Sequence, residues 1–154
     1  MELSSILSQE AVRILPSVSS KKRLFQELAD MLEGAHGVPA GVALDALQER
    51  ESLGPTGVGH GIALPHARIP GLDGVVGLFA RLDKPLEFDA VDRLPVDLVF
   101  ALFAPEDAGV EHLKALALVS RTMRNTTLCK KLRANNDAGT LYAMLTEVQA
   151  VRAA

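Results

Sequence analysis

A histidine at the end of a glycine-rich run is the part of this sequence best suited to chemistry. The run covers residues 59–66, reads Gly-His-Gly-Ile-Ala-Leu-Pro-His, and places Pro65 directly before His66. Glycines let the backbone turn sharply and bring its N–H groups close to a ligand. Pro65 fixes its own φ and biases Leu64 toward an extended conformation, so the histidine is held firmly. A neutral imidazole with one free ring nitrogen is a nucleophile, so the run predicts that His66 takes up an anionic group.

More ordinary interpretations of the same segment stay open on these residues alone. A lone histidine beside a proline is more often structural or solvated than catalytic, and a glycine-rich stretch is more often a surface loop. Residues 54–61 suggest a nucleotide loop, but they lack the Gly-Lys-Ser/Thr ending of a P-loop. The Gly-Val-Gly triplet at 57–59 has no glycine at position 62 to complete a dinucleotide fingerprint. A hydrolase or nucleotide-binding module built on this loop is therefore the weaker alternative.

The composition is typical of one compact α/β-type domain. The chain has 154 residues, of which 48% are apolar and 23% charged, which argues against disorder. A net charge of -3 and the lack of a basic stripe with interleaved aromatic residues argue against nucleic-acid binding. No apolar run approaches the roughly 20 residues of a membrane span, and residues 1–3 do not begin a signal peptide, so we expect no membrane insertion. A single cysteine, Cys129, is typical of a reducing compartment, and we expect a cytoplasmic protein with this residue in its core.

The four histidines and the cysteine do not have the spacing of a metal site. No pair follows the His-x3-His or Cys-x2-Cys pattern that makes zinc binding persuasive. We therefore expect neither a metal nor a cofactor.

Hydrophobic periodicity predicts helices at both ends of the chain and strands between them. The third helix is expected to use Leu113, Leu116, Ala117 and Ser120 as one face, and segment 54–61 is expected to break regular structure. This order predicts an α/β fold, with a single domain over residues 1–150, a mixed β-sheet and helices on both faces; residues 151–154 are expected to fray. Helices are predicted after Ser20 to Gly34 or Gly37, from Pro39 to Arg50, from Glu111, after Asn125 and after Asp137, and strands at 12–15, 62–64, 75–82 and 96–103.

The run at 59–66 closely resembles the active-site motif of enzyme IIA of the mannitol/fructose type, from the bacterial phosphoenolpyruvate:sugar phosphotransferase system. The resemblance extends over most of the chain. Segments 88–90 and 95–97 look most like the nitrogen-regulatory branch of that family. The matching segments are Glu49-Arg50-Glu51, Thr56-Gly57-Val58-Gly59, Phe88-Asp89-Ala90, Pro95 to Phe100 and His112-Leu113.

The resemblance implies roles for several residues to which the sequence alone assigns no special function. It implies that His66 is phosphorylated on Nε2, that His112 is the second active-site histidine, and that Arg50 grips the phosphate. Without the resemblance, His112 is a surface histidine at a helix N-terminus and Arg50 a solvated residue in a charged run. Thr56, Gly59 and Gly61 are expected to surround the phosphate. Pro55 stands where a Ser or Thr is frequent, so a hydroxyl donor is expected to be missing there.

The expected function is that of a phosphoryl carrier. The resemblance implies that His66 accepts a phosphoryl group from the histidine phosphocarrier protein and that phosphorylation controls binding to regulatory targets, such as potassium-transport or sensor proteins. The residues after the histidine, Ile69, Pro70 and Leu72, are expected to contribute to a docking patch. The alternative is a sugar-specific enzyme IIA for fructose or mannitol, which passes phosphate to a IIB domain.

Overall fold

A mixed sheet of six strands lies at the centre of the molecule. The computed structural model describes the backbone of residues 1–153 and the side chains of residues 1–147. The last helix ends at Ala153. The tail expected to fray covers residues 151–154; the side chains of these residues, and the whole of residue 154, lie outside the described residues. The elements are η1 (Leu3–Ser5), η2 (Gln9–Ala11), β1 (Val12–Leu15), α1 (Lys21–His36), α2 (Ala40–Ser52), β2 (Gly57–Gly59), β3 (Ile62–Ala63), β4 (His66–Ile69), β5 (Val76–Leu86), β6 (Val96–Pro105), α3 (Val110–Met123), α4 (Thr126–Ala134) and α5 (Ala138–Ala153).

Strand β6 organises the sheet. The strand order is β1-β5-β6-β3-β2, and β4 also pairs with β6. β5 and β6 run antiparallel, whereas β3 and β4 both run parallel to β6 and share one of its edges. β3 pairs at Leu98 and Val99, and β4 begins where His66 pairs with Leu102. Leu64 and Pro65 separate β3 from β4 along the same edge of β6. Pro65 has no N–H to donate to a neighbouring strand, so the pairing with β6 is interrupted at the residue least able to form it.

The helix ends follow the capping residues of the sequence. The Ser20 side chain accepts a hydrogen bond from the Arg23 N–H at the start of α1, and Gly37 ends that helix in the left-handed region at φ 71°. The Asn125 side chain accepts from the Leu128 N–H at the start of α4. The predicted helix starts at Ser20 and Asn125 are therefore confirmed.

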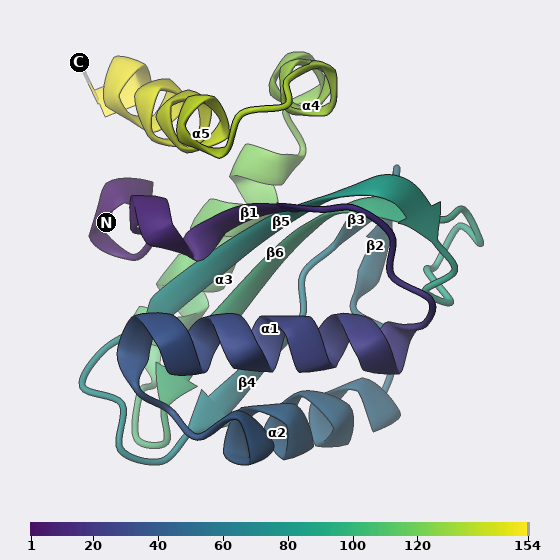
Figure 1. Cartoon of the computed structure of the whole chain (residues 1–154). Helices are drawn as coiled ribbons and strands as arrows, with labels where there is room; N and C mark the ends of the chain where they lie inside the picture. The colour runs from purple at the N-terminus through teal and green to yellow at the C-terminus, as the bar shows by residue number, and fades with distance from the viewer. Residues whose placement is uncertain (154) are drawn as a thin grey trace.

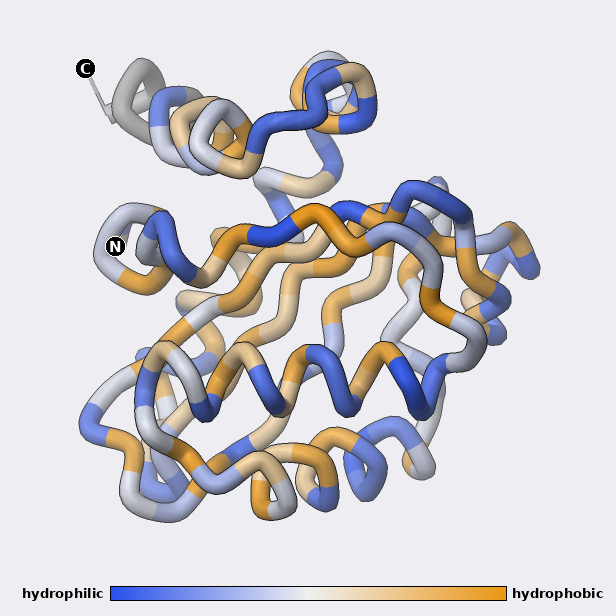
Figure 2. The backbone as a smooth tube through the Cα atoms, in the orientation of Figure 1, coloured by the Kyte–Doolittle hydropathy of each residue, from blue (hydrophilic) through white to orange (hydrophobic). Residues whose placement is uncertain are grey.

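Helices cover both faces of the sheet. Figure 1 shows α1 and α2 side by side along one face, with α3 crossing behind the other and α4 and α5 above the β1 side. The central strands are the most apolar part of the chain, and the polar residues gather on the outer faces of the helices and in the loops (Figure 2). Phe25, Phe79, Phe88, Phe100 and Phe103 are fully or almost fully buried. The predicted fold class, a single α/β domain with a mixed sheet and helices on both faces, is confirmed.

Several local predictions are wrong, and the errors share a cause. Segment 54–61 contains β2, which forms a hairpin with β3, and residues 66–69 form β4, which was not predicted. Ile69 is fully buried in β4, so it contributes nothing to a docking patch; Pro70 is exposed. In α3, Leu113 is 66% exposed, and the face turned inward carries His112, Ala115, Leu118 and Val119. Short edge strands and the rotation of a helix depend on partners far away in the sequence, which local patterns do not contain.

No helix within residues 1–153 is both long and apolar enough to cross a membrane.

Candidate functional site

His66 is anchored through one ring nitrogen at the first residue of β4. Its Nδ1 lies 3.0 Å from the carbonyl oxygen of Leu64. Because a carbonyl only accepts, Nδ1 carries the proton in this hydrogen bond, and the neutral ring keeps the lone pair of Nε2 free. The neighbouring backbone is fixed as well, since the Leu64 N–H donates to the Thr56 carbonyl at 2.9 Å and the Leu102 N–H donates to the Pro65 carbonyl at 2.9 Å. The ring is thus held in one tautomer and one orientation.

Arg50 lies against the free nitrogen of that ring. It comes from the last turn of α2, and its Nε–H donates to Nε2 of His66 at 3.2 Å. Its Nη1 donates to the carbonyl oxygen of Gly54 at 2.9 Å, which ties the guanidinium to the loop after the helix. An arginine in this position confirms the tautomer, because only an unprotonated Nε2 can accept its hydrogen bond.

His112 approaches His66 from the opposite helix layer. The two ring centroids are 5.8 Å apart and the rings are inclined by 50°. His112 is buried in the first turn of α3, and within the described part of the chain its buried Nδ1 has no hydrogen-bond partner. In the tautomer that carries its proton on Nε2, the ring has an N–H to donate to an acceptor in the site.

Burial keeps both histidines neutral. Desolvation is the main cause that lowers the pKa of His66 from its ordinary 6.5, and the Arg50 charge lowers it further. The hydrogen bond to Leu64 and the Glu51 carboxylate oppose this shift. Desolvation also lowers the pKa of His112, with smaller contributions from His66 and Arg68. Both imidazoles are therefore in the neutral form at pH 7, the form in which His66 is a nucleophile.

These lowered pKa values predict that the protein becomes less stable as the pH falls below 6.5. In the unfolded chain a histidine takes a proton near its ordinary pKa of 6.5, whereas folded His66 takes one only at a lower pH. Between the two pKa values the unfolded state binds more protons, so acid favours unfolding. Stability is retained above pH 6.5 and decreases as the pH falls from there toward the folded pKa.

Urea unfolding of the wild type and His66→Gln, at several pH values from about 7.5 down to about 5, measures this effect. We expect the free energy of unfolding of the variant to depend less steeply on pH than that of the wild type. The exposed residue His36 provides the control variant His36→Gln, which should keep the wild-type slope. Equal slopes in all three proteins would show that His66 does not carry the effect.

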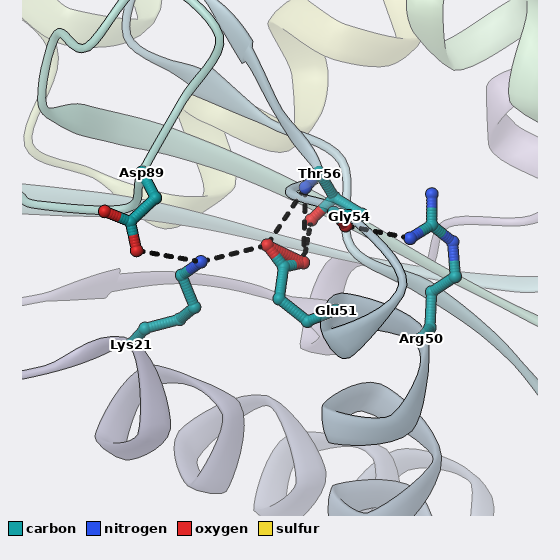
Figure 3. A network of polar contacts seen from close by, with 6 residues as sticks. All are labelled: Lys21, Arg50, Glu51, Gly54, Thr56 and Asp89. Atoms are coloured by element: carbon teal, nitrogen blue, oxygen red, sulfur yellow. Dashed lines mark hydrogen bonds and ion pairs between the residues drawn. The ribbon is translucent and has the colours of Figure 1, made fainter.

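A carboxylate network fixes the end of α2 that carries Arg50 (Figure 3). Glu51 accepts hydrogen bonds from the Thr56 N–H at 2.9 Å and from the Thr56 hydroxyl at 2.7 Å. Lys21 of α1 donates to the same carboxylate at 3.1 Å, and its Nζ lies 4.5 Å from the centre of the Phe88 ring. Only 8% of the Glu51 side chain is exposed, so these bonds are made largely out of water. The network joins α1, the end of α2 and the loop before β2.

Loss of the Glu51 carboxylate should destabilise the protein strongly. Glu51→Ala leaves the Thr56 hydroxyl and the Lys21 ammonium without their buried acceptor, and we expect it to lower the free energy of unfolding by about 2–4 kcal/mol. Glu49, an exposed residue of the same turn, gives the matched control, and Glu49→Ala should change stability by about 0.5 kcal/mol or less. Urea unfolding of the two variants checks the difference. Similar stabilities of both would contradict the role of the network.

The structure brings some of the sequence-predicted residues together and leaves others apart. His66, Arg50 and His112 form one cluster. Thr56 joins this cluster only indirectly, because in this conformation its hydroxyl is used by Glu51. Gly59 and Gly61 lie in the β2–β3 hairpin at φ 101° and 81°, where a Cβ on Gly59 would approach Asp92 and one on Gly61 would meet Arg133. Their place around a phosphate stays a prediction.

Sequence reasoning missed two further residues of the site. Glu51 was part of a matching segment but received no role, although its network positions Arg50. Arg68 lies two residues after His66 on the same strand, and its Nη1 donates to the carbonyl oxygens of Glu106 and Ala108, in the loop that leads into α3. It thereby links the strand that carries one histidine to the helix that carries the other. Alternate residues of a strand share a face, so Arg68 could have been placed on the same face as His66 if β4 had been predicted.

Fold and site together define an α/β protein with an open mixed sheet and a site centred on an anchored, neutral histidine. The model of the family described as "Phosphoenolpyruvate-dependent sugar phosphotransferase system, EIIA 2" matches residues 5–148, and the chain belongs to this family. The resemblance read from residues 59–66 is thereby confirmed.

Relatives of the chain point to the nitrogen-regulatory branch. It is 45% identical to a nitrogen regulatory protein of Bradyrhizobium diazoefficiens, a match that covers 94% of this chain and 95% of the relative. It is 32% identical to a fructose-specific EIIA component of Haloferax volcanii, with 96% of each covered. Its fold matches the crystal structure of the nitrogen regulatory protein IIA-Ntr from Neisseria meningitidis with a TM-score of 0.85 and 36% identity, over 93% of this chain and 98% of that one.

Proposed function

We propose that the protein is a phosphoryl carrier whose His66 accepts a phosphoryl group on Nε2 from the histidine phosphocarrier protein of the phosphotransferase system. The observation that carries this proposal is the pair of contacts on the His66 ring. Leu64 holds Nδ1–H, so Nε2 is the nucleophilic nitrogen, and Arg50 places a guanidinium beside it. A cation is thus already present at the point where the phosphoryl charge arrives.

The chemistry follows from these contacts. The Nε2 lone pair of His66 forms a bond to phosphorus, and the bond from phosphorus to the donor's imidazole nitrogen breaks, with its electron pair returning to the donor ring. Arg50 releases Nε2 and turns its N–H groups to the phosphoryl oxygens. The Leu64 carbonyl stabilises the positive charge that develops at Nδ1–H, and the His112 N–H provides another donor. Transfer between two imidazoles is nearly balanced in energy, so alignment and charge neutralisation are what the protein must supply.

Exposed apolar side chains beside the site suit the docking of a carrier protein. Leu53, which follows the helix of Arg50, is 81% exposed. Val110 and Leu113, on either side of His112, are 63% and 66% exposed. Large exposed apolar residues around a reactive group are typical of protein-binding surfaces. Of the patch expected after His66, the exposed Pro70 and the half-buried Leu72 stay a prediction.

Beyond carrying a phosphoryl group, the protein has a regulatory role in this proposal. We propose that the phosphorylated and unphosphorylated forms bind target proteins differently in nitrogen- or potassium-linked regulation, because phosphorylation adds roughly -1.5 to -2 charges to a small surface. The names of the relatives from Bradyrhizobium and Neisseria support this role. The buried free thiol of Cys129 suits a cytoplasmic location.

A sugar-specific role is the second candidate, favoured by the fructose-specific relative. In that role the phosphoryl group would pass from His66 to a IIB domain. Residues 57–63 form a hairpin that strand β4 follows directly, whereas a P-loop leads into a helix whose N-terminus holds the phosphate, which argues against the glycine-loop alternative.

One pair of assays separates the two roles. The phosphorylated protein is mixed with a fructose-type IIB domain, and in parallel both forms are titrated against a potassium-transport or sensor protein. We expect no transfer to IIB on the time scale of the donor reaction, and affinities for the target that differ by about tenfold or more between the two forms. Rapid transfer to IIB together with equal affinities for the target would assign the protein to sugar uptake.

A further inference from the structure

A cavity whose lining does not include His66, Arg50 or His112 lies beside the β2–β3 hairpin. Its volume is about 910 Å³, within the range of small-molecule sites. It is bounded by the β2–β3 hairpin, the start of β6, the last turn of α3 and helix α4. Ser120 of α3 lines it, eight residues after His112, which corresponds to a distance of about 12 Å along the helix. His66, Arg50 and His112 do not line the cavity, but Leu64, whose carbonyl holds His66, does, together with Gly59 and Gly61.

An ion pair holds the walls of this cavity together. Arg133 of α4 donates through Nε and Nη2 to the Asp97 carboxylate of β6, at distances of 2.9–3.1 Å. Its Nη2 also donates to the His60 carbonyl of the hairpin at 2.8 Å. Gly61 lies so close to this pair that an added Cβ would be 2.5 Å from Nη2 of Arg133. Three separate parts of the chain are thus fixed around the cavity, so it does not depend on a ligand to form.

Two cations of the lining remain without a carboxylate. Arg133 is neutralised by Asp97, but Arg124 and Lys130 have no carboxylate within 4 Å among residues 1–147. Both are exposed, and Arg124 donates only a long hydrogen bond of 3.4 Å to the Ser120 carbonyl. With three cations and one acid, the lining carries an excess of positive charge that attracts an anion.

The rest of the lining is apolar. Ile62, Leu64, Met123 and Cys129 are buried and form the floor. Val58 and Leu94, 49% and 54% exposed, belong to the rim. An apolar floor with a few cations suits a ligand that has both an apolar body and an anionic group.

We propose that this cavity binds a small organic anion with an apolar body, such as a phosphate monoester or a carboxylate carrying a short hydrocarbon chain. The anionic group pairs with Arg124 and Lys130, and the apolar part packs on Ile62, Leu64 and Met123. Neither inorganic phosphate nor an uncharged chain satisfies both parts of the lining.

Titration of the ¹⁵N-labelled protein, followed by amide NMR spectra, tests this proposal with four probes: hexyl phosphate, hexanoate, hexanol and inorganic phosphate. We expect hexyl phosphate or hexanoate to shift the amides of residues 58–64 and 120–133. Hexanol and inorganic phosphate should bind about tenfold more weakly, because each lacks one of the two contacts. Failure of both amphipathic anions to shift these amides at millimolar concentration would overturn the proposal, as would equal binding of hexanol.

Paired variants test the two cations. Arg124→Gln with Lys130→Gln should weaken hexyl phosphate binding about tenfold. The control pair Arg121→Gln with Lys131→Gln removes the same charge from exposed positions of α3 and α4 that do not line the cavity, and it should keep binding within about twofold. Thermal unfolding verifies that all four substitutions leave the fold intact. Equal loss of binding in both pairs would show that only net charge matters and would contradict a built site.

Discussion

His66→Ala abolishes phosphoryl acceptance in the proposed mechanism. The variant removes the only ring whose Nδ1 is held by the Leu64 carbonyl and whose Nε2 faces Arg50. Incubation with phosphoenolpyruvate, the general phosphotransferase proteins and the variant should give no acid-labile, base-stable label. The wild type should be labelled with one phosphoryl group per chain under the same conditions.

His36 provides the control for this experiment. It is an exposed histidine at the end of α1, and His36→Ala should be labelled like the wild type. Thermal unfolding of both variants shows whether loss of the label reflects loss of the fold. Full labelling of a folded His66→Ala protein would show that another residue accepts the phosphoryl group.

Replacement of either neighbour of His66 should slow the transfer while the protein stays folded. Removal of one charge-assisted donor from a transition state costs on the order of 10²-fold in rate, and we expect a loss of this size for Arg50→Ala and for His112→Ala. Arg50→Lys keeps the charge but loses the planar fork, so it should restore only part of the rate. Because His112 is buried, His112→Gln serves as a second variant of similar size that keeps a hydrogen-bonding group.

An NMR titration of His66 gives these variants a second readout. The Arg50 charge is one of the causes that lower the His66 pKa, so Arg50→Ala should raise that pKa toward its ordinary value. Arg23→Ala, at an exposed arginine of α1, should leave both the rate and the pKa unchanged. Phosphoryl transfer at the wild-type rate in both Arg50→Ala and His112→Ala would show that neither residue takes part in the transfer.

The sequence predicted well those parts of the fold in which local signals agree. Ser20 and Gly37 mark the two ends of α1, and the apolar runs at 75–82 and 96–103 correspond to β5 and β6. In each of these segments the pattern, the capping residue and the burial all favour the same element. His66 also stood out, because the glycines and Pro65 around it have direct consequences for the backbone.

What local patterns could not show are the relations between distant segments. Strand β4 is identified by its pairing with β6, about 36 residues away, rather than by its own four residues. The rotation of α3 that buries His112 and exposes Leu113 follows from packing against the sheet. The hydrogen bond from Arg50 to Nε2 of His66 joins two segments whose relative position no sequence motif predicts. The ion pair of Asp97 and Arg133, and the cavity around it, are invisible in the sequence for the same reason.

In the proposed mechanism Nε2 of His66 carries the phosphoryl group, because Nδ1–H donates to the Leu64 carbonyl. Long-range ¹H–¹⁵N NMR correlations of the phosphorylated, ¹⁵N-histidine-labelled protein distinguish the two ring nitrogens directly. The structure predicts that the ¹⁵N resonance of Nε2 of His66 changes to that of a phosphorylated nitrogen while Nδ1 keeps its proton. A phosphoryl group on Nδ1 of His66, or on any other histidine, would contradict the account.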